Sequence, residues 1–154
     1  MNPSFIAIVT FVLYGRMAFC EILSGSEGPT KVTKKGEMET SFSIDDNGLL
    51  SAQTRTWSSD KAKGFTGGVF IALFDETRSV QWNTEQKQYG VNGKWLGKSD
   101  RTDTWTEQVP TDVLPNIKYF AIVHRHTPTG RVLNWMKDHK EEIMLVTKMI
   151  ASSG

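Results

Sequence analysis

Two histidines, His124 and His126, stand two residues apart at the end of the apolar run Tyr119–Val123. This run of aromatic and aliphatic residues leads into the turn-forming sequence Thr-Pro-Thr-Gly, which indicates a buried strand that ends in a loop. Because side chains alternate along a strand, both imidazoles are expected on the same face of the sheet. Two imidazoles in that position can bind a metal ion or take part in proton transfer.

Either chemistry needs a further group beside the pair. His139, the remaining histidine of the chain, or the carboxylate of Asp103 can complete a site for a divalent metal ion. Without a metal, one histidine acts as a general base and the other histidine or Asp103 orients it. In a third interpretation, His126 is a solvated strand end and His124 is a hydrogen-bonded residue at the rim of the core. We favour this last interpretation and assign no catalytic residue, metal or cofactor, because the sequence near the pair offers no third ligand.

Trp95 indicates a different kind of site, because it lies in a glycine- and lysine-rich stretch that is difficult to bury. An aromatic ring can stack under a sugar ring while polar neighbours bind the hydroxyl groups. Asn92, Asp100 and Arg101 are near Trp95 in sequence, and His126 ends the strand where loops are expected to gather. These five residues form the predicted ligand site. Other tryptophans are expected in the core or on a sheet face: Trp57, Trp82, Trp105 and Trp135.

The charges of the chain nearly cancel, with 18 basic and 17 acidic residues and a net charge of +1. This balance argues against a protein that binds nucleic acid or anionic membranes through its overall charge. Two groups of basic residues stand out, but acidic residues separate them. They also lack the interspersed aromatic residues of a protein that binds single-stranded nucleic acid, so we expect both groups to be solvated surface. The groups are Lys31, Lys34 and Lys35, and Lys94, Lys98 and Arg101.

The N-terminal segment has the pattern of a secretory signal peptide. The apolar run 5–14 is about ten residues long, too short to span a bilayer as a helix. We expect residues 1–20 to be removed after Cys20, the only cysteine, which would leave a secreted chain with no disulfide and no transmembrane segment. Residues 21–30 are expected to be a flexible leader and residues 31–154 a single domain.

Alternating polar and apolar residues predict a mainly β fold of about seven strands. Asn47-Gly48 separates two alternating runs, 38–44 and 49–57, and predicts a hairpin. The run 69–74 is apolar on both faces, which indicates a central strand covered on both sides. Further strands are expected at 31–35, 79–83, 86–91, 101–106 and 119–126.

Apolar residues recur at steps of three and four from Val132 to Ile150, which predicts an amphipathic helix over about 131–150 packed on the sheet. The predicted fold is therefore an antiparallel β-sandwich or flattened barrel closed by one C-terminal helix.

For function, we favour a secreted, non-catalytic recognition protein that binds a glycan or another cell-surface ligand. Two alternatives remain open at this stage. One is a small hydrolase or metal-dependent enzyme that uses His124 and His126. The other is a toxin-like or effector protein that acts on membranes or host proteins through an exposed apolar loop.

Overall fold

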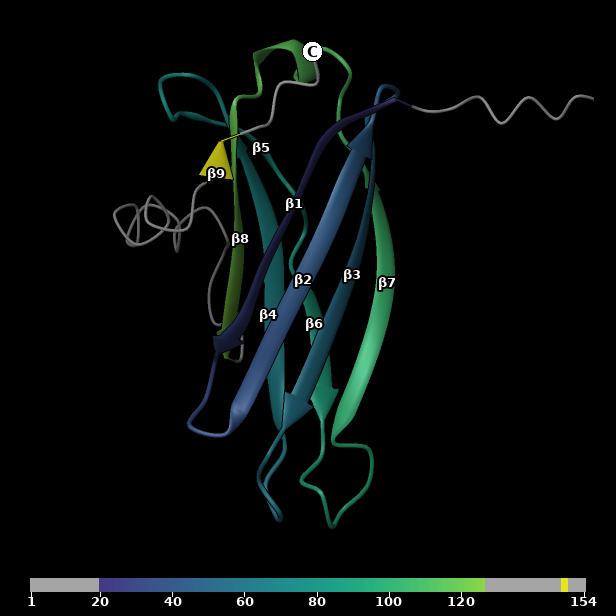
Figure 1. Ribbon diagram of the computed structural model, residues 1–154, viewed down its shortest axis with the longest axis vertical. Coiled ribbons are helices and arrows are strands. Elements are labelled where there is room, and N and C mark those ends of the chain that lie inside the picture. The colour runs from purple at the N-terminus through teal and green to yellow at the C-terminus, as the bar shows by residue number, and fades with distance from the viewer. Residues whose placement is uncertain (1–19, 127–147, 150–154) are drawn as a thin grey trace, which may run out of the picture.

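The computed structural model describes residues 20–126 and 148–149, which form two antiparallel sheets packed face to face as a β-sandwich (Figure 1). The first sheet has the order β1 (Glu21–Lys31), β2 (Gly36–Asp45), β3 (Leu49–Ser58), β7 (Asp100–Gln108). In the second sheet, β4 (Phe65–Phe74) pairs with β5 (Val80–Asn83), β6 (Lys87–Val91) and β8 (Tyr119–His126), and the two-residue β9 (Lys148–Met149) pairs with β8. A single 3₁₀ turn, Leu114–Asn116, precedes β8, and the described residues contain no α-helix. The predicted β-sandwich is confirmed, with eight strands of four residues or more in place of about seven.

The hairpin predicted at Asn47-Gly48 joins β2 to β3. Ile44 pairs with Leu50, and residues 46–48 connect the two strands. The Asp45 side chain accepts hydrogen bonds from the backbone N–H groups of Asn47 and Leu49, and Gly48 adopts a φ of 82° that a residue with a Cβ rarely takes. Local turn chemistry therefore sets this register.

The predicted flexible leader is wrong, because its residues form strand β1 and pair with β2 along most of their length. Serine, glycine and glutamate suit a solvated tail, yet they also suit an edge strand with one exposed face. Leu23 is buried in the core, and Gly25 lets the chain approach β8 so closely that a Cβ there would overlap the Phe120 ring. The tertiary contact with Phe120 explains why β1 carries a glycine at this point.

The main core lies between the sheets, where β4 and β8 face β2 and β3. Its largest fully buried side chains include Met38, Ile44, Leu50, Ile71 and Leu73. Phe120 and Ile122 of β8 also point into it, and the Phe120 ring meets the edge of Phe42 at 5.0 Å between centroids. This core fixes the inward face of β8, on which His124 also lies.

The outer face of the second sheet is apolar as well. Phe70, Ala72 and Ala121 are fully buried there, and Phe74 and Val123 nearly so, which confirms that β4 is covered on both sides. The C-terminal helix that we expected over this sheet lies outside the described residues except at 148–149. There the prediction is wrong, because Lys148 and Met149 pair with Phe120 and Tyr119 as a strand.

Candidate functional site at the loop end

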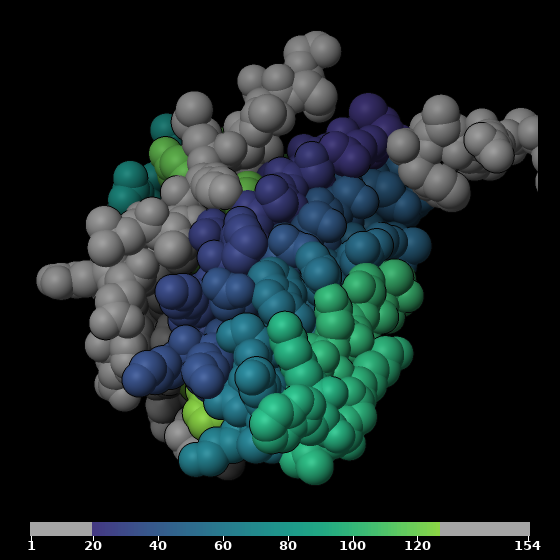
Figure 2. Space-filling model, turned by 60° about the horizontal axis from the view of Figure 1, so that its bottom comes forward, coloured from purple at the N-terminus to yellow at the C-terminus, as the bar shows by residue number. Residues whose placement is uncertain are grey.

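Three loops and the last residue of β8 meet at one end of the sandwich, which we call the loop end. The loops are residues 32–35, 59–64 and 92–99. Backbone hydrogen bonds join them, from Ser59 N–H to the carbonyl of Lys35 at 2.8 Å and from Lys94 N–H to that of Asp60 at 2.8 Å. Figure 2 turns this end toward the viewer, with the loops of β3–β4 and β6–β7 side by side. The linked loops form one continuous surface.

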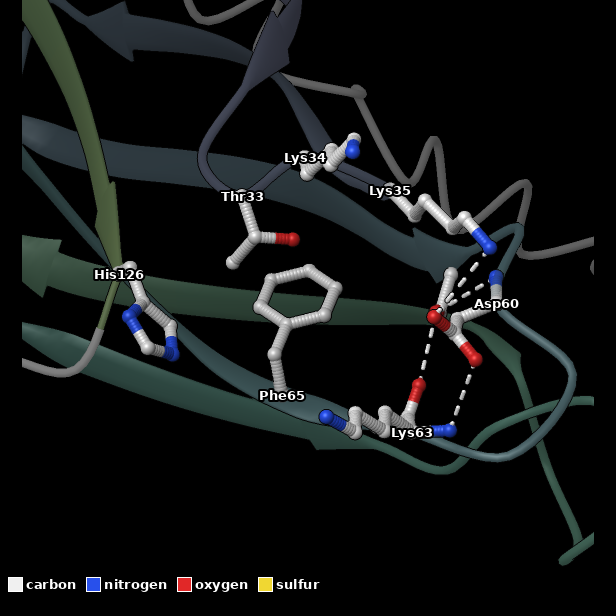
Figure 3. A pocket seen from close by; sticks show the side chains of 9 residues that line it. Thr33, Lys34, Lys35, Asp60, Lys63, Phe65 and His126 are labelled. Atoms are coloured by element: carbon white, nitrogen blue, oxygen red, sulfur yellow. Dashed lines mark hydrogen bonds and ion pairs between the residues drawn. The ribbon is translucent and has the colours of Figure 1, made fainter.

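A hollow of about 350 Å³ opens between the β1–β2 loop, the β3–β4 loop and the end of β8. This volume is at the lower end of the range for small-ligand sites. The rings of Phe65 and His126 lie on one side of it, 6.3 Å apart between centroids, and the ion pair of Lys35 with Asp60 lies on the other (Figure 3). The lining residues are Thr33, Lys34, Lys35, Ser58, Asp60, Lys63, Gly64, Phe65 and His126.

Positive charge dominates this hollow. The single carboxylate, Asp60, accepts hydrogen bonds from the backbone N–H groups of Lys63 and Ala62 and lies 3.5 Å from the ammonium of Lys35. Those two N–H groups, and then Lys35, hold the pKa of Asp60 below its usual value. Lys34 and Lys63 form no ion pair with any described residue. The hollow therefore suits an anionic group.

His124 belongs to a chain of hydrogen bonds inside the sandwich, away from this hollow. Trp105 Nε1–H, which can only donate, lies 3.1 Å from Thr54 Oγ1, and the Thr54 and Thr40 hydroxyls are 2.9 Å apart. Thr40 Oγ1 is 2.8 Å from His124 Nε2, and Thr30 Oγ1 is 3.0 Å from Nδ1. If each hydroxyl donates to the next group, Nε2 accepts and Nδ1–H donates to Thr30. The four donors from the Trp105 N–H to the His124 Nδ1–H then each have an acceptor, and the imidazole is neutral.

Burial lowers the pKa of His124 to about 4, in agreement with a neutral ring. His126, two residues further on, is exposed at the hollow. Asp103 is held by Arg101, whose Nε and Nη2 each lie 2.6 Å from a carboxylate oxygen. The hydrogen bonds of His124, His126 and Asp103 therefore do not join them into one constellation.

A metal site at the histidine pair would need ligands that these contacts do not supply. Within residues 20–126 and 148–149, no group of three or more histidine, cysteine, aspartate or glutamate side chains could hold a metal ion. His139, the other predicted ligand, lies outside the described residues.

The five residues of the predicted ligand site do not converge. Asp100 pairs with Arg55 on the outer face of the first sheet at 2.7 Å, whereas Arg101 points the other way, toward Tyr89. Asn92 and Trp95 lie in the 92–99 loop, and this loop contributes no residue to the hollow. Of the five, His126 alone lines the hollow, and Trp95 projects from the same end of the molecule.

The other tryptophans among the described residues are placed as expected. Trp105 is buried in the core, and Trp82 packs against it. Trp57 lies on the outer face of the first sheet, where its Nε1–H donates to Glu37 and the Arg55 guanidinium lies over its ring. Trp135 lies outside the described residues.

Sequence reasoning missed Thr33, Asp60, Lys63 and Phe65 as parts of a site. Thr33 lies in the β1–β2 loop, at least 27 positions before the other three, which belong to the β3–β4 loop and the start of β4. Sequence reasoning also treated the lysines as a dispersed surface. The available signal was their position, since the lysines at 34–35, 61–63 and 94–98 all fall in connections at one end of an antiparallel sandwich.

No protein-family model, curated protein or solved structure matches this chain. Among the described residues, no helix has the length and apolar character needed to cross a membrane. The geometry of the loop end is therefore the guide to what this protein binds.

Proposed function

We propose that this protein is a secreted, non-catalytic recognition protein of the β-sandwich class, and that it binds an acidic carbohydrate in the hollow at the loop end. The observation that carries the proposal is the combination of an aromatic ring with unpaired lysines in one concave site. A neutral sugar would use only the aromatic ring and hydrogen-bond partners for its hydroxyl groups. A carboxylate or sulfate group on the sugar would in addition pair with the lysines.

The side chains around the hollow suit this ligand. The Phe65 ring is partly exposed, so one face of a sugar ring can stack on it. Lys34 and Lys63 are exposed and can each donate to an anionic oxygen, and Thr33 offers a hydroxyl. The Lys35–Asp60 pair holds the opposite wall in place. Because loops that extend from a rigid sandwich commonly carry binding residues, the location also agrees with a recognition role.

Secretion is part of the proposal and is supported by the apolar run 5–14, which has the length of a signal-peptide core. An exported chain would meet acidic polysaccharides at cell surfaces and in extracellular matrices. Removal of residues 1–20 would take away Cys20 and leave a domain held together by its core alone.

A glycan array that includes neutral, uronic-acid-containing and sulfated sugars tests the proposal. We expect binding to acidic glycans, and we expect the double variant Lys34→Gln/Lys63→Gln to lose it. Lys118→Gln is the matched control, because Lys118 is an exposed lysine that precedes β8 at the opposite end of the sandwich. An array without hits, or equal binding by the double variant and the control, would refute this function.

A further inference from the structure

The 92–99 loop presents two adjacent apolar side chains to solvent. Trp95 is 73% exposed and Leu96 is 69% exposed, the two highest values among the large exposed hydrophobic residues of the described chain. The loop is held in place by its backbone, since Trp95 N–H donates to the carbonyl of Lys61 at 2.9 Å and Asn92 N–H to that of Lys98 at 2.9 Å. An apolar tip supported in this way is already arranged for contact with another surface.

Lysines surround this tip. The loops 32–35, 59–64 and 92–99 contain six lysines and one acidic residue, Asp60. The ammonium of Lys61 lies 5.5 Å from the centre of the Trp95 ring, and Lys94 and Lys98 belong to the same loop as Trp95. Six of the 18 basic residues of the chain are therefore collected at the end that carries the most exposed apolar pair among the described residues.

The opposite end has the reverse charge. Its connections, residues 46–48, 75–79 and 109–118, contain four acidic residues and two basic ones. The described connections are thus polarised from one end of the sandwich to the other, positive at the loop end and negative at the opposite end. Near an anionic surface this distribution orients the molecule with the loop end forward.

We propose that the loop end docks on an anionic lipid surface, with Trp95 and Leu96 entering the interface and the surrounding lysines contacting the headgroups. Tryptophan is favoured at the membrane–water interface, where an apolar ring and a polar N–H are both accommodated. Lysines at the same level are attracted by the negative surface potential of acidic lipids. The proposal concerns the 92–99 loop and does not depend on a carbohydrate in the hollow.

A lipid surface fits this tip better than a protein partner does. A stable protein–protein interface buries about 800 Å² on each partner, with a central apolar patch from which charged residues are depleted. Here the apolar part consists of two side chains on a projecting loop, and lysines stand immediately beside them. This arrangement resembles two weak membrane signals that act together, shallow apolar insertion and electrostatic attraction.

Sedimentation with carbohydrate-free vesicles tests the inference with the complete chain. We expect it to bind vesicles of phosphatidylcholine with phosphatidylserine, to bind pure phosphatidylcholine much less, and to dissociate at high salt. Trp95→Ala/Leu96→Ser should weaken binding about tenfold or more, because it removes the inserted apolar area. Each of Lys61→Gln, Lys94→Gln and Lys98→Gln should weaken it about fivefold.

Leu49→Ser and Val80→Ser are the matched controls, since both residues are exposed apolar side chains outside the loop end, 42% and 41% exposed. Both should bind vesicles as the unchanged protein does. Unchanged binding by Trp95→Ala/Leu96→Ser, or equal binding to both lipid compositions, would overturn the inference. The inference would also be overturned if the unchanged protein self-associated in size-exclusion chromatography and the double variant did not. The tip would then be an interface between two copies of the chain. Failure on vesicles leaves the glycan array result unaffected, so the two proposals can be separated.

Discussion

Protonation of His124 should destabilise the sandwich. The imidazole is partly buried between the sheets, and both ring nitrogens are hydrogen-bonded to threonine hydroxyls, Thr30 and Thr40. A protonated ring must donate from both nitrogens, which reverses the bond to Thr40. Thr40 then donates to Thr54, whose oxygen also accepts from Trp105, so the Thr54 hydroxyl proton loses its acceptor in this chain.

The sign and the magnitude follow from the pKa of His124. Burial lowers it from 6.5 to about 4, so between these values the unfolded chain binds the proton and the folded one does not. The free energy of unfolding therefore decreases as the pH falls from about 6.5 to about 4 and then levels off for this group. At about 1.36 kcal/mol for each pKa unit, the loss is about 3 kcal/mol, a large part of the ordinary stability of a domain.

Urea unfolding at several pH values between 7 and 4 measures this loss. With an m-value of about 2 kcal/mol/M, the midpoint should move down by about 1.5 M over this range. His124→Gln should remove most of that movement, and His126→Gln should keep it, because His126 is exposed at the loop end. The carboxylates with lowered pKa values, such as Asp60 and Asp75, lose their contribution only as the pH falls through and below 3.8. An equal pH dependence in both histidine variants would refute the argument.

Two further pairs of substitutions test the packing inside the sandwich by urea unfolding. Thr54→Val should destabilise the protein by about 1–3 kcal/mol, because it leaves the buried indole N–H of Trp105 without an acceptor. Thr56→Val is the matched control and should be neutral or slightly stabilising, because the buried Thr56 hydroxyl has no hydrogen-bond partner among the described residues. If the two variants lost equal stability, the hydrogen-bond chain would not be what makes Thr54 important. Gly25→Val should lower the free energy of unfolding by about 1–3 kcal/mol or more, because the new side chain collides with Phe120. In Gly90→Ala the new Cβ meets its nearest neighbour at 3.4 Å, so the free energy of unfolding should change by less than about 0.5 kcal/mol. A tolerated Gly25→Val would show that β1 does not pack on β8 as described.

Local patterns in the sequence predicted the strands that have one apolar face or a strong turn signal. The β2–β3 hairpin follows from alternation and from Asn47-Gly48, and the double burial of β4 follows from a run that is apolar on both faces. Strand β1 was not predicted, because a polar edge strand and a solvated leader have similar compositions. Its contact with Phe120 involves a residue about 95 positions away, which no local window includes.

The difference between local sequence patterns and contacts of distant residues also applies to the functional groups. The sequence by itself determined which groups exist: three histidines, five tryptophans, a single cysteine and nearly balanced charge. Tertiary structure decided which of them meet, because antiparallel pairing brings alternate connections to the same end of a sandwich whatever their distance along the chain. That geometry placed His124 inside among threonines and His126 beside Phe65, although the two are neighbours in sequence. It also collected six scattered lysines around Trp95 and the hollow, where their charges add.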